Sequence, residues 1–134
     1  MKMKIAVFEN EYKSVKNAFE VANLLNFNSE LIIKNFASSQ AFEFSEIQNY
    51  SVIFIDIDLS TQSHLDGFAL IQKIVSNFPS LTDRIVILTG NNQINEALKE
   101  RNIKIKNIKI INKPTDYDEL TKIINMIIKA DIQH

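Results

Sequence analysis

Short runs of apolar, often β-branched residues are the feature that most constrains what this chain can fold into. Five such runs occur, at residues 5–8, 31–34, 52–55, 85–88 and 108–111. Most of them lack a strict alternation with polar residues, which is typical of strands that are covered on both faces in a parallel sheet. We therefore expect five parallel strands.

Between these runs, apolar residues repeat with the period of a helix. Residues at i, i+3, i+4 and i+7 are apolar from Val15, from Ile71 and from Leu120, which predicts three helices with one buried stripe each. Residues 40–48 and 92–101 are expected to form a second and a fourth helix. Strand and helix then alternate along the whole chain, which predicts a doubly wound α/β domain with a five-stranded parallel sheet and five helices.

Lysines indicate which strands lie at the edges of this sheet. They occur only inside the second and fifth runs, at Lys34 and Lys109. A charge on a strand commonly protects a sheet edge, so we expect these two strands at the edges. No linker, low-complexity tract or internal repeat interrupts the pattern, and we expect residues 1–134 to form a single domain with no output domain.

Composition excludes several kinds of functional site. Two glycines cannot supply a glycine-rich phosphate loop, and the absence of cysteine with only two histidines excludes disulfides, cysteine-based zinc sites and multi-histidine metal sites. A net charge of −1 gives no indication of binding to nucleic acid or to an anionic membrane. The first apolar run is too short for a signal peptide, so we expect a cytoplasmic protein.

Polar residues follow four of the five runs at the point where each strand is expected to end. Glu9 and Asn10 follow the first run, Asp56 the third, Thr89 the fourth and Lys113 the fifth. Ligands of open parallel sheets bind at the carboxyl ends of the strands. Oxygen donors there suit Mg²⁺, an Asp can attack phosphorus to form an acyl phosphate, and lysine and hydroxyl groups stabilise phosphoryl oxygens.

Taken in order, these motifs resemble the receiver domain of two-component response regulators, and the resemblance covers essentially the whole chain. It rests on Glu9-Asn10, Asp56, Asp66-Gly67, Thr89-Gly90 and Lys113-Pro114. It implies a stand-alone, CheY-like receiver with the flavodoxin-like strand order 2-1-3-4-5. Asp56 would be the phosphoacceptor, Thr89 and Lys113 would contact the phosphoryl group, and the small Gly90 would leave room for it.

The resemblance also implies Mg²⁺ as the cofactor, held by Glu9, Asn10 and Asp56, with Asp58 as a further ligand through its backbone carbonyl. Asn10 stands where the family carries an Asp, so a neutral amide replaces one carboxylate. Asp58 places another carboxylate beside the site. Ile110 occupies the position where many receivers carry a switching Tyr or Phe, and the loop over residues 57–65 is longer than usual in the family.

The expected function is phosphoryl transfer to Asp56 from a sensor histidine kinase or a phosphotransfer protein. Signalling would then follow by protein contact or phosphorelay, through the face formed by the fourth helix, the fifth strand and the fifth helix. Lys104, Lys106 and Lys109 would form a basic strip on that face. Such a protein is a phosphoacceptor regulator with slow autodephosphorylation, and not an enzyme in the usual sense.

Two other functions fit parts of the sequence. Asn10 and Ile110 favour a degenerate receiver that binds a partner protein independently of phosphorylation. The Asp56-Ile57-Asp58 motif resembles the nucleophile motif of haloacid-dehalogenase-type phosphatases. That family places its nucleophile near the N-terminus and needs a larger fold, so the phosphatase is the weaker of the two alternatives.

Overall fold

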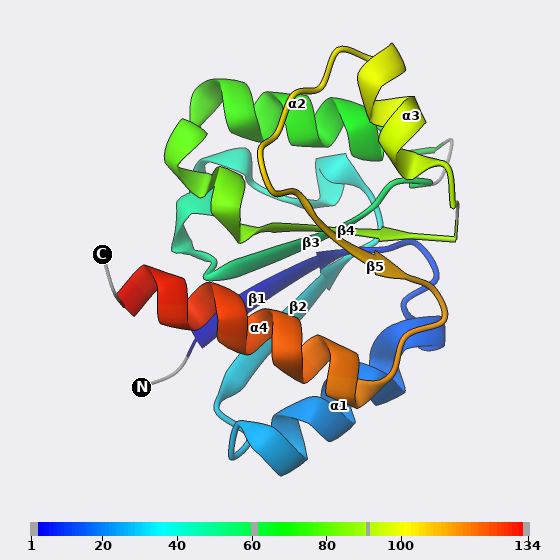
Figure 1. The fold of residues 1–134 in the computed structure, drawn as a ribbon. Coiled ribbons are helices and arrows are strands. Elements are labelled where there is room, and N and C mark those ends of the chain that lie inside the picture. The colour runs from blue at the N-terminus through cyan, green and yellow to red at the C-terminus, as the bar shows by residue number, and fades with distance from the viewer. Residues whose placement is uncertain (1–2, 60–61, 91, 133–134) are drawn as a thin grey trace.

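Five parallel strands form one sheet at the centre of the molecule (Figure 1). The computed structural model describes residues 3–59, 62–90 and 92–132. The strands are β1 (Met3–Phe8), β2 (Leu31–Phe36), β3 (Val52–Asp56), β4 (Ile85–Thr89) and β5 (Lys109–Asn112). Their order is β2-β1-β3-β4-β5 and every neighbouring pair is parallel, so the predicted order and the predicted edge strands are confirmed.

Helices cover both faces of this sheet. The α-helices in the described residues are α1 (Lys13–Asn26), α2 (Gly67–Asn77), α3 (Ile94–Glu100) and α4 (Tyr117–Ile132). Three 3₁₀ segments accompany them: η1 (Ser39–Ala41), η2 (Phe44–Asn49) and η3 (Pro79–Arg84). Figure 1 shows α1 and α4 together on one side of the sheet, with α2 and α3 on the other. None of the helices in the described ranges is long and apolar enough to span a membrane.

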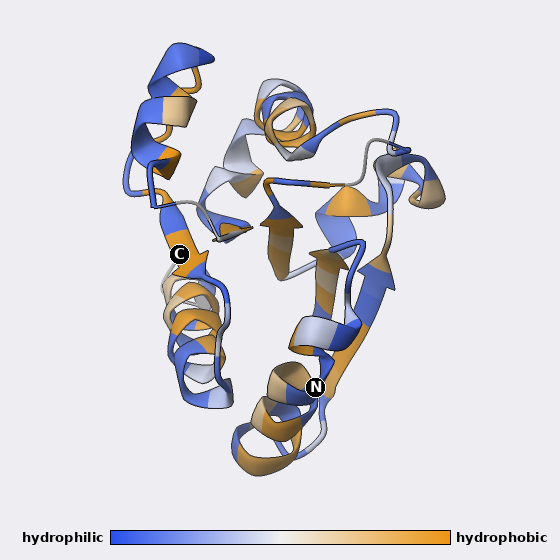
Figure 2. Cartoon of the chain, turned by 90° about the vertical axis from the view of Figure 1, so that its right-hand side faces the viewer, coloured by the Kyte–Doolittle hydropathy of each residue, from blue (hydrophilic) through white to orange (hydrophobic). Residues whose placement is uncertain are grey.

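Successive side chains of each central strand lie on opposite faces of the sheet. Ile5 and Val7 of β1 pack in a core with the buried stripes of α1 and α4. Ala6 and Phe8 pack in the other core, with α2 and α3. Figure 2 shows the central strands hydrophobic along most of their length, whereas the helices mix hydrophobic and hydrophilic residues. Burial on both faces explains why the strand runs are continuously apolar.

The helix predicted for residues 40–48 was wrong, because this segment forms η1 and η2 with an extended link between them. Phe42 and Glu43 have extended backbone, with φ/ψ of −122°/136° and −80°/106°. Phe42 packs edge-on against Phe8 and Phe36, with ring centroids 5.3 and 4.7 Å away. Phe42 and Phe44 both pack against the same core. Residues two apart share one side in an extended segment, but not in a helix.

Hydrogen bonds fix η1 to the loop that follows β3. The backbone N–H of Ser39 donates to Ser63 Oγ at 2.8 Å, and the N–H of Leu65 donates to Ser39 Oγ at 2.9 Å. The N–H of His64 donates to Gln40 Oε1 at 2.8 Å. The long loop predicted after Asp56 is therefore held at its far end, while its residues 60–61 lie outside the described residues.

The ends of three helices show how the sequence sets their limits. Asp66 caps α2 by accepting a hydrogen bond from the N–H of Ala69 at 2.8 Å, and Asp116 caps α4 by accepting from the N–H of Glu119 at 2.9 Å. Helix α3 is shorter than the predicted range 92–101. It ends just before Asn102, whose φ of 60° is the left-handed conformation that stops a helix.

Candidate functional site

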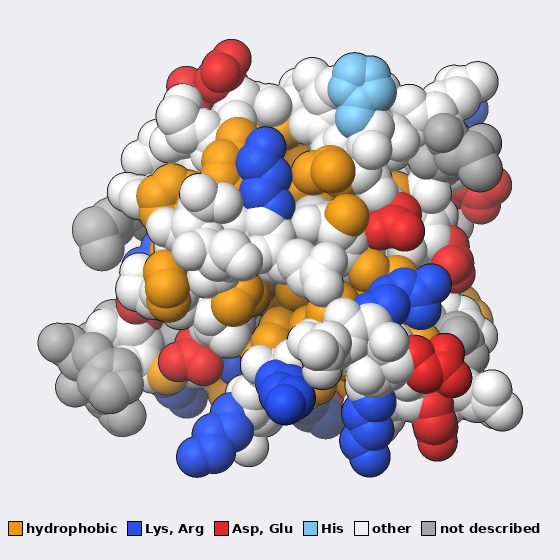
Figure 3. Space-filling view, turned by 90° about the horizontal axis from the view of Figure 1, so that it is seen from above, with side chains coloured by type: hydrophobic (Ala, Val, Ile, Leu, Met, Phe, Trp, Pro, Cys, Tyr) orange, Lys and Arg blue, Asp and Glu red, His pale blue; other side chains and the backbone are white. Residues whose placement is uncertain are grey.

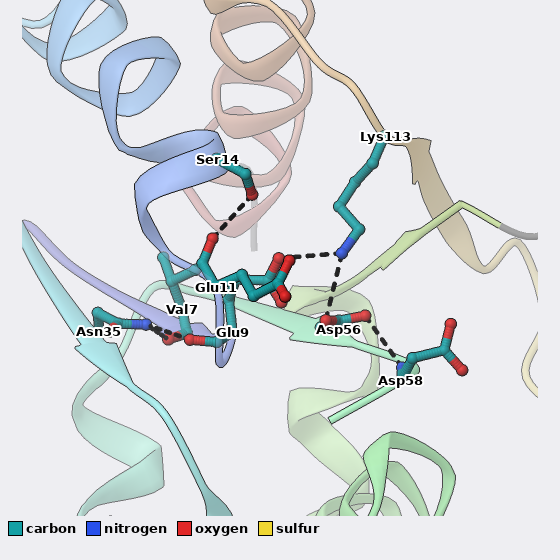
Figure 4. Close-up of polar contacts among 8 residues, drawn as sticks. All are labelled: Val7, Glu9, Glu11, Ser14, Asn35, Asp56, Asp58 and Lys113. Carbon is teal, nitrogen blue, oxygen red and sulfur yellow. Dashed lines mark hydrogen bonds and ion pairs between the residues drawn. The ribbon is translucent and has the colours of Figure 1, made fainter. Parts of the chain in front are cut away.

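Three of the predicted site residues meet at the carboxyl edge of the sheet (Figure 4). Lys113 Nζ lies 2.9 Å from Glu9 Oε1 and 3.2 Å from Asp56 Oδ2. Glu9 is fully buried, and the side chain of Asp56 is only 3% exposed. A single ammonium group therefore bridges two buried carboxylates that come from the ends of β1 and β3.

Asp56 is positioned by the strand that it ends and by the residues that follow it. The N–H of Ile57 donates to the carbonyl of Leu88 at 3.0 Å, which extends the pairing of β3 and β4 past the last strand residue. The N–H of Asp58 donates to Asp56 Oδ1 at 3.0 Å. The carboxylate of Asp58 itself is directed away from Asp56, as Figure 4 shows.

Lys113 is anchored by its main chain as well as by its side chain. Its backbone N–H donates to the carbonyl of Thr89 at 2.8 Å, one residue beyond the last paired residue of β5. Thr89 is fully buried at the end of β4. The peptide bond between Lys113 and Pro114 is cis. The ends of β4 and β5 are thus joined at the residue whose ammonium contacts Asp56.

Glu9 binds its proton more tightly than an ordinary carboxyl group does. The pKa of Glu9 is raised to about 7, first by burial and then by its interaction with the carboxyl group of Asp56, while Lys113 partly opposes both effects. Glu9 Oε2 is buried and has no hydrogen-bond partner in the described residues. Burial lowers the pKa of Lys113, but its contacts with Glu9 and Asp56 outweigh this and raise the pKa above its usual value.

The charges at this edge do not balance when both carboxyl groups are ionised. Glu9 and Asp56 together carry two negative charges, against one positive charge on Lys113. A second cation or a proton is needed to neutralise the site, because uncompensated buried charge is costly. The chemistry of the donors fits Mg²⁺, which takes oxygen ligands, and the unpartnered Glu9 Oε2 is one such donor.

The other two predicted metal ligands are Asn10 and Asp58, and the backbone N–H of Asp58 bonds to Asp56. Asn10 is exposed and lines a hollow of about 320 Å³ with Ser38 and Gln62. No hydrogen bond within the described part of the chain joins Asn10 to Glu9 or Asp56. Across the same residues, no group of three or more His, Cys, Asp or Glu side chains gathers as a metal site. Glu9 and Asp56 are the acidic pair that the fold brings together.

Asn35 is a supporting residue that the sequence analysis missed. Its side-chain amide donates to the carbonyls of Val7 at 3.0 Å and Glu9 at 2.9 Å (Figure 4). The N–H of Glu9 donates to the carbonyl of Phe36 at 3.1 Å, so Glu9 is held from both sides of its peptide unit. The only signal in the sequence was an amide side chain near the end of the second strand, and no motif marks it.

The two glycines of the chain differ in what surrounds them. A Cβ at Gly67 would lie 2.6 Å from the Cα of Ile57 and would also collide with the carbonyl oxygen of Asp56. Gly67 therefore lets the first turn of α2 pack directly on the main chain of the predicted phosphoacceptor. A Cβ at Gly90 would meet no atom within 4 Å. The space expected beside Thr89 is open.

The predicted basic strip is not a single feature. Lys104 is exposed beside α2 and helps to line a groove there. Lys109 Nζ instead donates to the carbonyl of Asp83 at 3.0 Å and lines a different hollow, beside α4. Ile110, at the predicted switch position, is half-buried and packs against the core on the α2 side.

Comparisons with known proteins agree with this arrangement. The family model described as "Response regulator receiver domain" matches residues 13–125. Response regulator DrrB, a Thermotoga maritima OmpR/PhoB homologue, has a TM-score of 0.72 at 17% identity over 98% of this chain and 54% of its own. No curated protein matches the chain at a significant level.

Two receiver domains match over nearly their full length. A receiver domain protein from Clostridium thermocellum has a TM-score of 0.70 at 18% identity, covering 98% of each chain. The receiver domain of AraT, a response regulator from Geobacillus stearothermophilus, has a TM-score of 0.73 at 19% identity, covering 99% of this chain and 98% of its own. At these identities the similarity shows a shared fold.

Proposed function

Because this chain belongs to the response regulator receiver family of two-component signalling, we propose that it is a phosphoacceptor whose Asp56 receives a phosphoryl group from a phosphohistidine. Receiver domains typically bind Mg²⁺, act with a kinase partner and are not enzymes in the usual sense. For this chain, the donor would be a sensor histidine kinase or a histidine-containing phosphotransfer protein.

The observation that supports this proposal is the contact between Asp56 and Lys113, 3.2 Å apart at the carboxyl edge of the sheet. Asp56 follows directly from buried strand residues and is held by the N–H of Asp58 on one oxygen. Its other oxygen faces an ammonium group. An Asp held this way is oriented for attack before a donor arrives, which lowers the entropic part of the barrier.

In the proposed reaction, one oxygen of the Asp56 carboxylate forms a bond to phosphorus. The bond between phosphorus and the donor imidazole nitrogen breaks, and its electron pair stays on the imidazole. Lys113 pairs with the negative oxygens of the transferred group, and the hydroxyl of Thr89 donates a hydrogen bond to one of them. The product is an acyl phosphate on Asp56.

Glu9, Asp56, the amide of Asn10 and the carbonyl of Asp58 are the residues that would hold Mg²⁺. When bound, the ion supplies positive charge against the carboxylates and the phosphoryl oxygens. In its absence, Lys113 serves as the counter-charge for both carboxylates. Asn35 fixes the main chain of Glu9, so the carboxylate from β1 stays directed at the site.

The link from phosphorylation to signalling would run through the ends of β4 and β5. Thr89 and Lys113 are both expected to contact the phosphoryl group, and the N–H of Lys113 already bonds to the carbonyl of Thr89. A shift of either residue would therefore displace the ends of both strands. Because Ile110 is aliphatic, we propose that this chain signals without the aromatic rotamer change of many receivers.

The test is an intact-mass measurement of the full chain after incubation with Mg²⁺ and a small phosphodonor such as acetyl phosphate. We expect a mass gain of one phosphoryl group, which hydroxylamine removes because an acyl phosphate is labile to it. Asp56→Asn is the matched variant and should show no gain. An adduct that persists in this variant, or no adduct on the wild-type chain, would overturn the proposal.

A second candidate, a module that binds a partner without phosphorylation, is favoured by the exposed position of Asn10. The same mass measurement decides between the two. Absence of the adduct, in a chain that still folds and still binds a partner, would favour the binding module.

A further inference from the structure

We propose that the groove between α2 and residues 102–106 binds an extended, acidic peptide segment of a partner protein. The inference names a partner surface for the proposed signalling role. It places that surface on the α2 side of the sheet, away from the β5 and α4 face where Lys109 lies.

The groove itself has an apolar floor and one open side. It encloses about 350 Å³ and is lined by Ile71, Gln72, Val75, Ser76, Asn102, Ile103, Lys104 and Ile105. Ile71 and Ile103 are buried at its base, while Val75 and Ile105 are half-buried along its walls. This volume is enough for a branched aliphatic side chain of a partner, which would bury apolar surface on both.

The segment that forms one wall already has the pattern of a strand. After the left-handed Asn102, apolar Ile103 and Ile105 are turned inward, and Lys104 and Lys106 are exposed. Among the described residues, no main-chain hydrogen bond involves Lys104, Ile105 or Lys106. Open main-chain donors and acceptors beside an alternating pattern are what a second extended chain needs to pair by strand addition.

The charges around the groove select an acidic occupant. Lys104 and Lys106 form no ion pair within the described ranges, and α2 carries no acidic residue. Lys73 of α2 does not contribute to this groove, because it contacts Phe44 and lines a different hollow. Figure 3 looks down on this side of the molecule and shows basic and acidic side chains beside exposed hydrophobic ones. Alternating acidic and aliphatic residues would complement this surface.

Helix α2 connects the groove to the predicted phosphoacceptor. Helix α2 supplies Ile71 and Val75 to the groove, and the same helix begins at Gly67 against the main chain of Asp56. A change at Asp56 that moves the start of α2 therefore reaches the groove wall. This is why a partner docked here would sense the state of the site.

The experiment uses the full chain labelled with ¹⁵N and a capped six-residue peptide in which Glu alternates with Ile. We expect saturable chemical-shift changes confined to residues 71–76 and 102–106. Lys104→Glu combined with Lys106→Glu should weaken the binding of the peptide by about tenfold or more. The matched double reversal, Lys13→Glu with Lys129→Glu on exposed positions of α1 and α4, should leave the affinity unchanged.

Three results would overturn the inference: no saturable binding, shifts centred on β5 and α4, or equal binding of an oligothymidylate of the same charge. A peptide in which Ser replaces Ile must also bind more weakly, since otherwise only charge is recognised. The titration is run without a phosphodonor and repeated on Asp56→Asn. Failure here leaves the mass measurement on Asp56 unaffected, and failure of phosphorylation leaves this titration interpretable.

Discussion

The two sides of the sheet are built from the same strands but are covered in different ways. On one side, α1 and α4 are long helices that contact each other and bury regular stripes against the strands. On the other side, α2 is the one long helix in the described residues, and η1, η2, short α3 and the extended residues 103–106 cover the rest.

The two sides differ in how continuously their helices cover the sheet. Two long helices cover the first side with aliphatic and aromatic stripes at helical spacing. On the second side, short pieces meet at their ends and leave grooves between them. One hollow beside α2 encloses about 520 Å³ and is lined by Ser39, Gln40, Phe42, Phe44, His64, Leu65, Leu70 and Lys73. Hollows also border the start of α1 and the end of α4, so the two sides differ in how the sheet is covered and not in whether hollows occur.

The largest expected effect is on stability, at the point where α2 meets the sheet. Gly67→Ala places a Cβ against the main chain of Asp56 and Ile57, which cannot move without disturbing β3. We expect a loss of unfolding free energy of about 3 kcal/mol or more, measured by urea denaturation. A loss below about 1 kcal/mol would show that α2 is free to move away from the sheet.

A pair of truncations compares the packing of the two sides directly. Phe19 is fully buried on the α1 side, 5.0 Å edge-on from the ring of Phe54, whereas Phe44 is half-buried on the other. Phe19→Ala should cost about 3–5 kcal/mol, and Phe44→Ala clearly less, because less surface and a smaller cavity are involved. Equal losses in urea denaturation would contradict the contrast between the sides.

A pH titration tests the edge that both sides share. Because the pKa of Glu9 is raised to about 7 in the folded protein from 4.5, folding favours its protonated form. The contribution of Glu9 to the unfolding free energy is fully present below pH 4.5. It is lost as the pH rises through 7, by about 3 kcal/mol in total without metal. Urea denaturation at pH 5 and pH 7.5 measures this fall.

Glu9→Gln is the control for this titration, because it keeps the shape of the side chain and removes its ionisation. The variant should lose most of the slope between the two pH values. Added Mg²⁺ should restore stability to the wild-type chain at pH 7.5 and have little effect on the variant. A wild-type chain with no slope in this range would contradict the raised pKa.

The smallest effect on stability is expected at the second glycine. Gly90→Leu meets open space, so the unfolding free energy should change by no more than about 0.5 kcal/mol. The same side chain would stand beside a phosphoryl group on Asp56, and the rate of adduct formation in the mass measurement should fall. A normal rate would contradict the placement of the phosphoryl group next to Thr89.

The sequence allowed the sheet and the centre of the site to be predicted, because both follow from strand ends. Runs such as residues 52–55 locate a buried strand, and the carboxyl edge then collects whatever polar residues come next, here Glu9, Asp56 and Lys113. The helix predicted for residues 40–48 was wrong, because Phe42, which packs on Phe8 and Phe36, has an extended backbone. Phe8 lies 34 residues earlier in the sequence, so no local pattern reveals its contact with Phe42.

The site details that escaped prediction also depend on contacts across the chain. Asn35 acts on Glu9 from a neighbouring strand, 26 residues away in sequence. Asn10 is exposed in the turn after Glu9, and its predicted place at the metal stays a prediction. Sequence motifs identify which residue types are present at an edge, whereas the direction of each side chain is decided by the turn that follows the strand.

Gly67 has a consequence for how this chain can change over evolutionary time. A clash with a side chain can be relieved by a second substitution that makes the neighbour smaller. The atoms that face Gly67 belong to the main chain of Asp56 and Ile57, which every amino acid shares. No compensating mutation at those two positions exists, so this glycine should persist in descendants of the chain even where the residues around it diverge.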